Sequence, residues 1–179
     1  MKPVRLAVVG LAKTQAVELG PHNILVNVLC PGPIATDRLV DLTRQALPYL
    51  KETRGCVVNL SSVAGIRAFP GIAPYAVSKA AVDQLTHCLA LELGPLGVRV
   101  NAVNPGFVRT PMQEREVAWE ARLRGITPEE VLRDYLRQTP LGRLQTPEDV
   151  AKAVSFLAGP DSDFLTGEAL EVNGGAWIF

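Results

Sequence analysis

The chain of 179 residues is long enough to bury the core of one domain, and 47% of its residues are hydrophobic. Lysine plus arginine and aspartate plus glutamate both total 18, and this balance gives no support to binding of nucleic acid or of an anionic membrane. The sequence shows neither a signal peptide nor an apolar run of the roughly 18 residues that suggest a membrane span, so a cytoplasmic globular protein is expected.

The cysteines and histidines do not predict a disulfide framework or a metal site. Cys30, Cys56 and Cys88 are odd in number and lie within or beside apolar segments, which favours buried reduced thiols. His22 and His87 have no second ligand at metal spacing.

The amino-terminal third of the chain predicts a helix, a strand and a second helix. Helical spacing runs over 5–19 and stops at Gly20-Pro21. The segment ILVNVL, residues 24–29, is short and β-rich, and the turn residues 31–33 close it. A helix is expected over 37–52, because its leucines and alanines fall along one stripe.

The rest of the chain continues the alternation of strands and helices. The predicted elements are a buried strand over 56–60, a helix over 78–93, a strand over 98–103, two or three helices within 111–158, and a strand over 169–172. Thr146, which precedes Pro147 and Glu148, is a typical helix cap. Strands separated by helices predict an α/β fold with a parallel sheet and helices on its faces.

Ligands of open parallel sheets bind beyond the carboxyl ends of the strands, and polar or turn residues follow two predicted strands there. Ser61-Ser62 follow the first strand, and Pro105-Gly106 follow the next. Between them, the segment APYAVSKAAVDQL places Tyr75 and Lys79 four residues apart, on one face of a helix.

A series of motifs in fixed order resembles the carboxyl-terminal half of a short-chain dehydrogenase/reductase (SDR), over about residues 39–178. The motifs are VVNLSSVAG, YAVSK, GVRVNAVNPGFVRTPM, PLGR and TPEDVAKAVSFLAGPDSDFLTGEALEVNGG. A bare Tyr-x-x-x-Lys is a weak signal, but here a serine lies 13 residues before the tyrosine and a Pro-Gly turn follows the next strand. The resemblance implies a truncated Rossmann-like, doubly wound parallel sheet with helices on both faces.

The resemblance implies an NAD(P)-dependent oxidoreductase that interconverts a carbonyl and a secondary alcohol by hydride transfer. It makes Tyr75 the general acid/base and Ser62 the residue that holds the substrate oxygen. Lys79 would supply a positive charge that lowers the pKa of the phenol, and it would bind the nicotinamide ribose. The segment 111–139 would form the lid that decides the substrate, which is a small-molecule carbonyl or alcohol.

The resemblance also implies a nicotinamide-binding set. Pro105 and Gly106 would form the floor beneath the nicotinamide, and the backbone of Val108 and the side chain of Thr110 would reach its carboxamide. Tyr75 and Lys79 complete the cofactor-binding residues. The choice between NAD and NADP is not implied.

The same residues also have purely structural interpretations. Tyr75 could be a half-buried tyrosine at a helix start, with Lys79 solvated beside it. Ser62 could be a turn or capping serine, and Thr110 could cap the helix that follows Pro111.

The sequence departs from the family that it resembles in the amino-terminal half. It contains no Thr-Gly-x-x-x-Gly-x-Gly turn, so the adenosine side of the cofactor site is expected to be missing. The family's catalytic asparagine, 27 residues before the serine, would fall near Ala35. The alternative function is therefore a catalytically impaired SDR-like subunit or a truncated gene product. Such a protein could form a homo-oligomer through the helices 37–52 and 78–93.

Residues 1–36 resemble a later part of the same chain. Shifted by 74 residues, 7–36 aligns with 81–110, including ELGP at Glu18 and at Glu92. The expected organisation is one partial Rossmann-like domain over 1–179, in which 1–36 partially repeats 81–110 and 37–179 is the family-like half. We expect the strand 24–29 to pair in parallel with 56–60; the other interpretation is a loosely attached relic.

Overall fold

The computed structural model describes residues 46–177. Three parallel strands form a sheet in the order β1 (Cys56–Leu60), β2 (Arg99–Pro105) and β3 (Ala169–Val172). Cys56 lies opposite Arg99, and Ala102 lies opposite Ala169. All three strands therefore end at the same edge of the sheet, where ligands of such folds bind.

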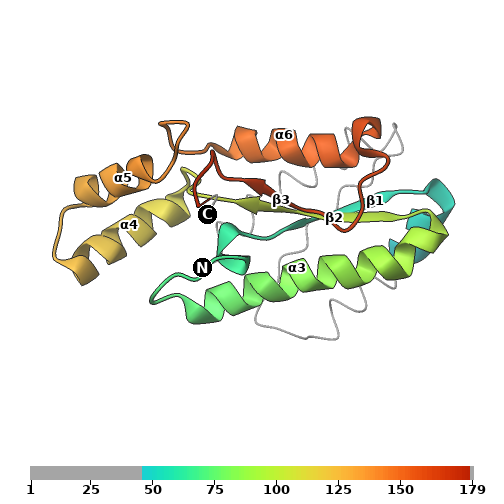
Figure 1. Cartoon of the computed structure of the whole chain (residues 1–179), viewed down its shortest axis with the longest axis horizontal. Coiled ribbons are helices and arrows are strands. Elements are labelled where there is room, and N and C mark those ends of the chain that lie inside the picture. The colour runs from blue at the N-terminus through green and yellow to red at the C-terminus, as the bar shows by residue number, and fades with distance from the viewer. Residues whose placement is uncertain (1–45, 178–179) are drawn as a thin grey trace.

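Helices cover both faces of this sheet (Figure 1). The long helix α3 (Ala73–Leu93) packs on β1 and β2 from one side, and α6 (Pro147–Ala158) packs on the strands from the other. The helices α4 (Pro111–Arg124) and α5 (Pro128–Arg137) form a pair beyond the carboxyl end of β2. The predicted α/β fold, with a parallel Rossmann-like sheet and helices on both faces, is confirmed.

Short 3-10 turns and one further helical segment complete the described residues. The turns are η2 (Val63–Gly65), η3 (Gly94–Leu96) and η4 (Pro160–Ser162). Residues 46–53 are helical and agree with the end of the helix predicted over 37–52. The predicted helix 5–19, the predicted strand 24–29 and Cys30 lie outside the described residues.

Two apolar clusters hold these elements together. One lies between α3 and β2 and includes Leu50, Leu93, Val98 and Val100, each at most 5% exposed. The other fixes α4 against α5 and consists of Val117, Ala121, Val131 and Tyr135. Burial of such side chains contributes about 1.5–3 kcal/mol each, so the α4–α5 pair has a small core of its own.

Two element boundaries and the exposure of one cysteine differ from the sequence predictions. Helix α3 begins at Ala73 rather than Ser78, because Pro74 occupies its first turn, where proline costs no hydrogen bond. Strand β2 extends to Pro105, which pairs with Val172. Cys88 is exposed, so the prediction of a buried thiol is wrong for this residue, whereas Cys56 is buried. Both are free thiols.

No helix within 46–177 is long and apolar enough to cross a membrane.

Thr146 caps α6 as predicted, in a reciprocal arrangement with Asp149. The Thr146 hydroxyl accepts from the Asp149 amide at 3.4 Å, and the Asp149 carboxylate accepts from the Thr146 amide at 2.8 Å. Arg143 donates two further hydrogen bonds to this carboxylate, at 2.6 and 2.8 Å. The Arg143 guanidinium, followed by the Thr146 amide, holds the pKa of Asp149 well below its usual range.

The lowered pKa of Asp149 predicts a loss of stability in acid. Its contribution is present above the unfolded-state pKa of about 4 and is lost as the pH falls through the lower folded-state pKa. We expect the urea midpoint of Asp149→Asn to fall less than that of the wild type between about pH 5 and about pH 2. Glu148→Gln, on the same turn, is the control and should follow the wild type. If the urea midpoint falls equally with pH in Asp149→Asn and in the wild type, the lowered pKa of Asp149 does not contribute to stability.

Candidate active site

Three predicted catalytic side chains meet beyond the carboxyl end of β1. Ser62 directly follows this strand, and its Oγ accepts a hydrogen bond from the Ala64 amide at 3.2 Å, which caps η2. Tyr75 and Lys79 lie on successive turns at the start of α3, and Lys79 Nζ is 5.7 Å from the centroid of the Tyr75 ring. The side chain of Ser62 lies near enough to the Tyr75 phenol to lower its pKa.

Hydrogen bonds tie the end of β1 to the backbone of α3. Lys79 Nζ donates to the Leu60 carbonyl at 2.9 Å, and Ser61 Oγ donates to the Lys79 carbonyl at 3.1 Å. Ser61 is therefore a structural link, while Ser62 is the serine that faces the phenol. The capping role that the sequence left open for Ser62 exists together with this contact.

The pKa of Tyr75 is raised above its ordinary value, and burial is the largest cause. The carboxylate of Glu116 raises this pKa further, and the hydrogen bond with Ser62 lowers it. The whole residue is 40% exposed, so burial of the phenol is only partial. The sequence predicted a lowered pKa, and the structure gives the opposite direction because burial disfavours the phenolate. The phenol is therefore protonated at neutral pH.

The predicted nicotinamide-binding residues lie after β2 and are fixed by backbone contacts. The Gly106 amide donates to the Val172 carbonyl at 3.2 Å, and a Cβ on Gly106 would lie 3.1 Å from Asn173 Cα. Glycine at this position lets the chain pass close to the end of β3. Thr110 caps α4, and its Oγ accepts from the Gln113 amide at 3.3 Å.

Sequence reasoning missed Gln145, which fixes the loop 106–109. This glutamine is 8% exposed. Its side-chain oxygen accepts from the Gly106 amide at 3.1 Å. Its backbone accepts from Arg109 at 2.8 Å and donates to Phe107 at 3.0 Å, beside a one-residue bridge to Val108. No periodic pattern marks a glutamine just ahead of a helix cap, so this role could not be predicted from the sequence.

The donors around this edge fit the nicotinamide side of a dinucleotide. The ammonium of Lys79 and the hydroxyl of Tyr75 are suited to ribose hydroxyls. Thr110 uses its oxygen as an acceptor within the cap, which leaves its hydroxyl proton to donate to a carboxamide. Within the described residues, no group of three histidine, cysteine, aspartate or glutamate side chains could hold a metal ion.

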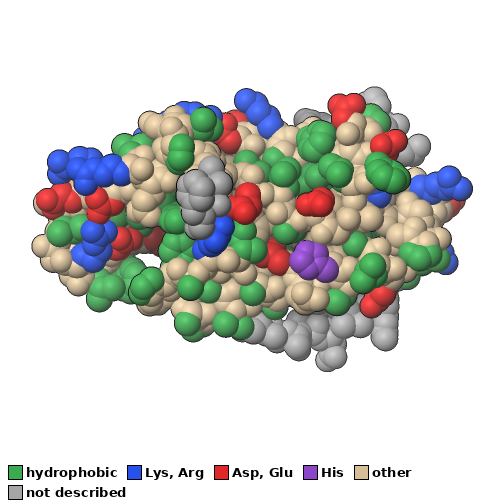
Figure 2. Space-filling model, viewed as in Figure 1, with side chains coloured by type: hydrophobic (Ala, Val, Ile, Leu, Met, Phe, Trp, Pro, Cys, Tyr) green, Lys and Arg blue, Asp and Glu red, His purple; other side chains and the backbone are tan. Residues whose placement is uncertain are grey.

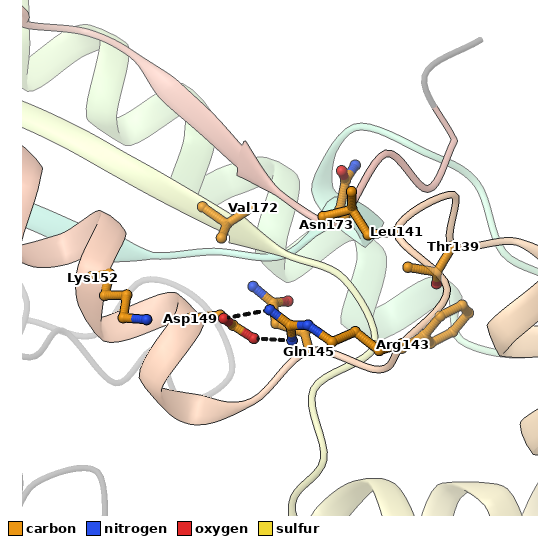
Figure 3. Close-up of a pocket in the computed structure, with 10 residues that line it drawn as sticks. Thr139, Leu141, Arg143, Gln145, Asp149, Lys152, Val172 and Asn173 are labelled. Carbon is orange, nitrogen blue, oxygen red and sulfur yellow. Dashed lines mark hydrogen bonds and ion pairs between the residues drawn. The ribbon is translucent and has the colours of Figure 1, made fainter.

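A cavity of about 220 Å³ opens on the α6 side of the loop 106–109 (Figure 3). Gln145, Val172 and Asn173 contribute to its wall, and Arg143 is joined to Asp149 within it by two hydrogen bonds. None of the three predicted catalytic side chains lines this cavity. It is therefore separate from the site of Tyr75.

The predicted lid consists of α4 and α5, and α4 approaches the phenol. A Cβ on Gly71, ahead of α3, would lie 3.3 Å from the Trp119 ring. Glu116, one turn before Trp119, is the residue whose charge acts on Tyr75. The pKa of Glu116 is raised by burial, and Arg115 partly offsets this effect. Figure 2 shows acidic and basic side chains interleaved at this end of the molecule.

Aromatic contacts join the carboxyl-terminal segment to the lid. Phe107 stacks on Tyr135 with a centroid distance of 3.8 Å, and Trp177 meets Phe107 edge to face at 4.6 Å. Trp177 also meets Phe69 at 4.9 Å and donates from Nε1 to Gln138 Oε1 at 3.0 Å. One side chain thus links the loop after η2, the loop after β2 and the end of α5.

A family model described as enoyl-(acyl carrier protein) reductase matches residues 38–176 and, separately, residues 1–45. The chain belongs to the SDR family. The second match covers the segment that aligns with 81–110 in the sequence, so similarity to this SDR family model occurs in both parts of the chain.

Curated SDR relatives are similar to this chain over about half of their own length. The 3-oxoacyl-(acyl-carrier-protein) reductase FabG of Thermotoga maritima is 40% identical over 139 residues, which cover 77% of this chain and 52% of the relative. The meso-2,3-butanediol dehydrogenase of Serratia marcescens is 39% identical over 140 residues, 78% of this chain and 51% of the relative.

Solved SDR structures superpose on the same part of the chain. Levodione reductase gives a TM-score of 0.68 at 31% identity, with 77% of this chain and 53% of that chain covered. The 3-oxoacyl-(acyl-carrier protein) reductase of Brucella melitensis gives 0.65 at 36% identity, with 82% and 55% covered. These likenesses support general oxidoreductase activity for the family-like half.

Proposed function

We propose that this SDR chain is an NAD(P)-dependent oxidoreductase that interconverts a carbonyl and a secondary alcohol. The observation that carries the proposal is that Ser62 lies near enough to the Tyr75 phenol to lower its pKa, with Lys79 on the next turn of the helix that carries Tyr75. The printed names of its relatives, reductases and dehydrogenases of oxo and hydroxy compounds, support the reaction type. A small molecule is the proposed substrate, and the cytoplasm is the proposed location.

Each of the three side chains has a distinct role in this reaction. Tyr75 donates its phenolic proton to the carbonyl oxygen during reduction and takes a proton from the alcohol during oxidation. Ser62 accepts from the Ala64 amide and keeps its own proton to donate to the substrate oxygen, where negative charge develops. The ammonium of Lys79 stabilises the phenolate that remains after proton transfer. When bound, the nicotinamide supplies or accepts the hydride.

The raised pKa of Tyr75 favours reduction at neutral pH. A protonated phenol is ready to donate, whereas oxidation requires the phenolate to be formed first. A bound oxidised nicotinamide carries a positive charge and would lower this pKa, which is how the same phenol would serve in the oxidative direction.

An alternative function is a catalytically impaired SDR-like subunit. It is favoured by one observation, the absence of a Thr-Gly-x-x-x-Gly-x-Gly turn from the 179 residues. Such a chain could assemble as a homo-oligomer through residues 37–52 and 78–93, both predicted from the sequence to be helical. The oxidoreductase must bind a nicotinamide cofactor, whereas the alternative does not require this binding.

Titration with NADH and NADPH, followed by fluorescence, separates these functions. We expect saturable binding with a Kd between about 10 μM and about 1 mM, because nicotinamide-side contacts act without pyrophosphate contacts. Lys79→Ala should weaken binding about tenfold through loss of the ribose contact, which corresponds to about 1.4 kcal/mol. Lys152→Ala, on α6, is the matched control and should leave the Kd unchanged. Absence of binding up to millimolar concentration would favour the alternative.

A further inference from the structure

A buried polar pair lies directly beneath the Ser62 peptide. Asn104, at the end of β2, is fully buried, and Asp83, on α3, is 5% exposed. Asn104 Nδ2 donates to the Ser62 carbonyl at 3.1 Å and to Asp83 Oδ2 at 3.0 Å. Both hydrogens of one amide are thus used to connect the serine to the helix that carries Tyr75 and Lys79.

The Asp83 carboxylate fixes which way the Asn104 amide points. A carboxylate accepts hydrogen bonds, so it selects the orientation in which Asn104 presents its nitrogen. If the amide turned over, its oxygen would face both the carboxylate and the Ser62 carbonyl, and all three groups are acceptors. Asp83 therefore holds the second N–H of Asn104 on the Ser62 carbonyl.

The close packing of the segment 61–65 on α3 makes this arrangement tight. A Cβ on Gly65 would clash with Asp83 Oδ2 and would lie 2.9 Å from the Lys79 carbonyl carbon. Ser62 is therefore held by two hydrogen bonds. Asn104 donates to its backbone carbonyl, and the Ala64 amide donates to its side-chain hydroxyl.

The pair carries an energetic cost. Asp83 Oδ1 and Asn104 Oδ1 are buried without a hydrogen-bond partner among the described residues. A buried polar atom that lacks a partner typically costs about 1–3 kcal/mol. A second polar contact on the same face of α3, from Asn59 Nδ2 to Thr86 Oγ1 at 2.8 Å, also joins the sheet to the helix but does not involve Ser62. This contact provides a matched comparison.

We propose that Asp83 and Asn104 are positioning residues that orient the Ser62 peptide, and with it the Ser62 hydroxyl, toward the Tyr75 phenol. The role rests on the proposed function of Ser62 and Tyr75, but its main readouts do not require turnover. The hydroxyl proton of Ser62 is useful only if it points toward the side of the phenol where the substrate oxygen would bind. A rotation of the Ser62 peptide would break this geometry without removing any catalytic group.

The test measures the ionisation of Tyr75 by NMR in the full chain, with tyrosine labelled with 13C at Cζ. Because the bond from Ser62 lowers the pKa of Tyr75, its loss raises this pKa. Asp83→Ala and Asn104→Ala should each raise it by about half a unit to one unit, as Ser62→Ala does. The Ala64 amide should exchange its hydrogen about tenfold faster, since it loses its fixed acceptor.

Two variants separate positioning from stability. Asp83→Asn keeps an acceptor for the Asn104 amide and should restore the pKa of Tyr75 to near the wild-type value. Thr86→Val breaks the neighbouring contact and should lower the melting temperature while leaving Tyr75 and the Ala64 amide unchanged. If the alanine variants lower the melting temperature but leave the pKa of Tyr75 unaltered, the pair is only structural and the proposal is overturned.

The proposal remains testable if the alanine variants do not fold. Asn104→Ser keeps one hydroxyl donor but cannot reach both acceptors, so an unaltered pKa of Tyr75 in this variant also overturns it. Where the wild type reduces a carbonyl substrate, kcat should fall in Asp83→Ala with KM little changed. A wild type that shows no turnover would count against the proposed function alone, since the NMR comparison between variants still decides the role of the pair.

Discussion

Replacement of Tyr75 by phenylalanine is expected to lower the rate of carbonyl reduction by about 10²–10⁴-fold, the usual contribution of a positioned general acid. The residue is 40% exposed, and phenylalanine keeps the aromatic ring in its place on α3, so the fold should persist. The rate is measured as NADH or NADPH consumption with a panel of small carbonyl compounds, and circular dichroism checks the fold. A variant that keeps more than about a tenth of the activity would remove Tyr75 from the reaction.

The pH dependence provides a second test of the same phenol. Because burial and Glu116 raise its pKa, reduction should stay constant from neutral pH to about pH 9 and decline only as the phenol ionises above about pH 10. Glu116→Gln removes one of the two causes and should shift this decline to lower pH. Glu114→Gln, an exposed change on the same helix, is the control and should leave the profile in place.

Gly65→Ala is expected to reduce the free energy of unfolding by about 1–3 kcal/mol, the typical cost of overpacking. The added Cβ meets Asp83 and the backbone of α3 at Lys79, and a helix backbone cannot move aside as a flexible side chain can. The loop that carries Ser62 would be pushed off the helix that carries Tyr75, so activity should fall together with stability. Urea denaturation measures the first effect.

Gly94→Ala is the matched control for this change. A Cβ at Gly94 meets nothing within 4 Å, and the backbone there is helical, with φ −55° and ψ −46°. Gly94 precedes Pro95, and a Cβ before proline disfavours the helical backbone, so we expect alanine here to cause a smaller loss of stability than Gly65→Ala rather than a gain. Equal effects at Gly65 and Gly94 would show that the close contact with α3 is unimportant.

The sequence predicted the elements whose signals are local. The strand CVVNL and the strand ALEV are short apolar runs between turn residues, and both have the predicted bounds in the structure. Thr146 caps its helix because the capping pattern is complete within four residues. The start of α3 was placed too late because Pro74 is compatible with a loop as well as with a first helical turn. Exposure of Cys88 depends on which face of α3 meets the sheet.

For the candidate site, the motif order identified Ser62, Tyr75 and Lys79, which the structure brings together, while their roles stay predictions. The contacts of Asp83 with Asn104 and of Gln145 with Gly106 join residues 21 and 39 positions apart, and no periodic pattern announces them. The direction of the pKa shift of Tyr75 was predicted wrongly. It depends on a balance of burial, a hydrogen bond and a carboxylate on another helix, which only three-dimensional placement supplies.

The positions of the two tryptophans give this chain a built-in optical probe. Trp119 lies against Gly71 beside the entry to α3, whereas Trp177 is enclosed by Phe69 and Phe107 at the far end of the chain. With only these two indoles in the sequence, a phenylalanine at either position leaves a single emitter. The emission of each such protein reports on one wall of the site, so that a rearrangement of α4 can be distinguished from a release of the carboxyl-terminal segment.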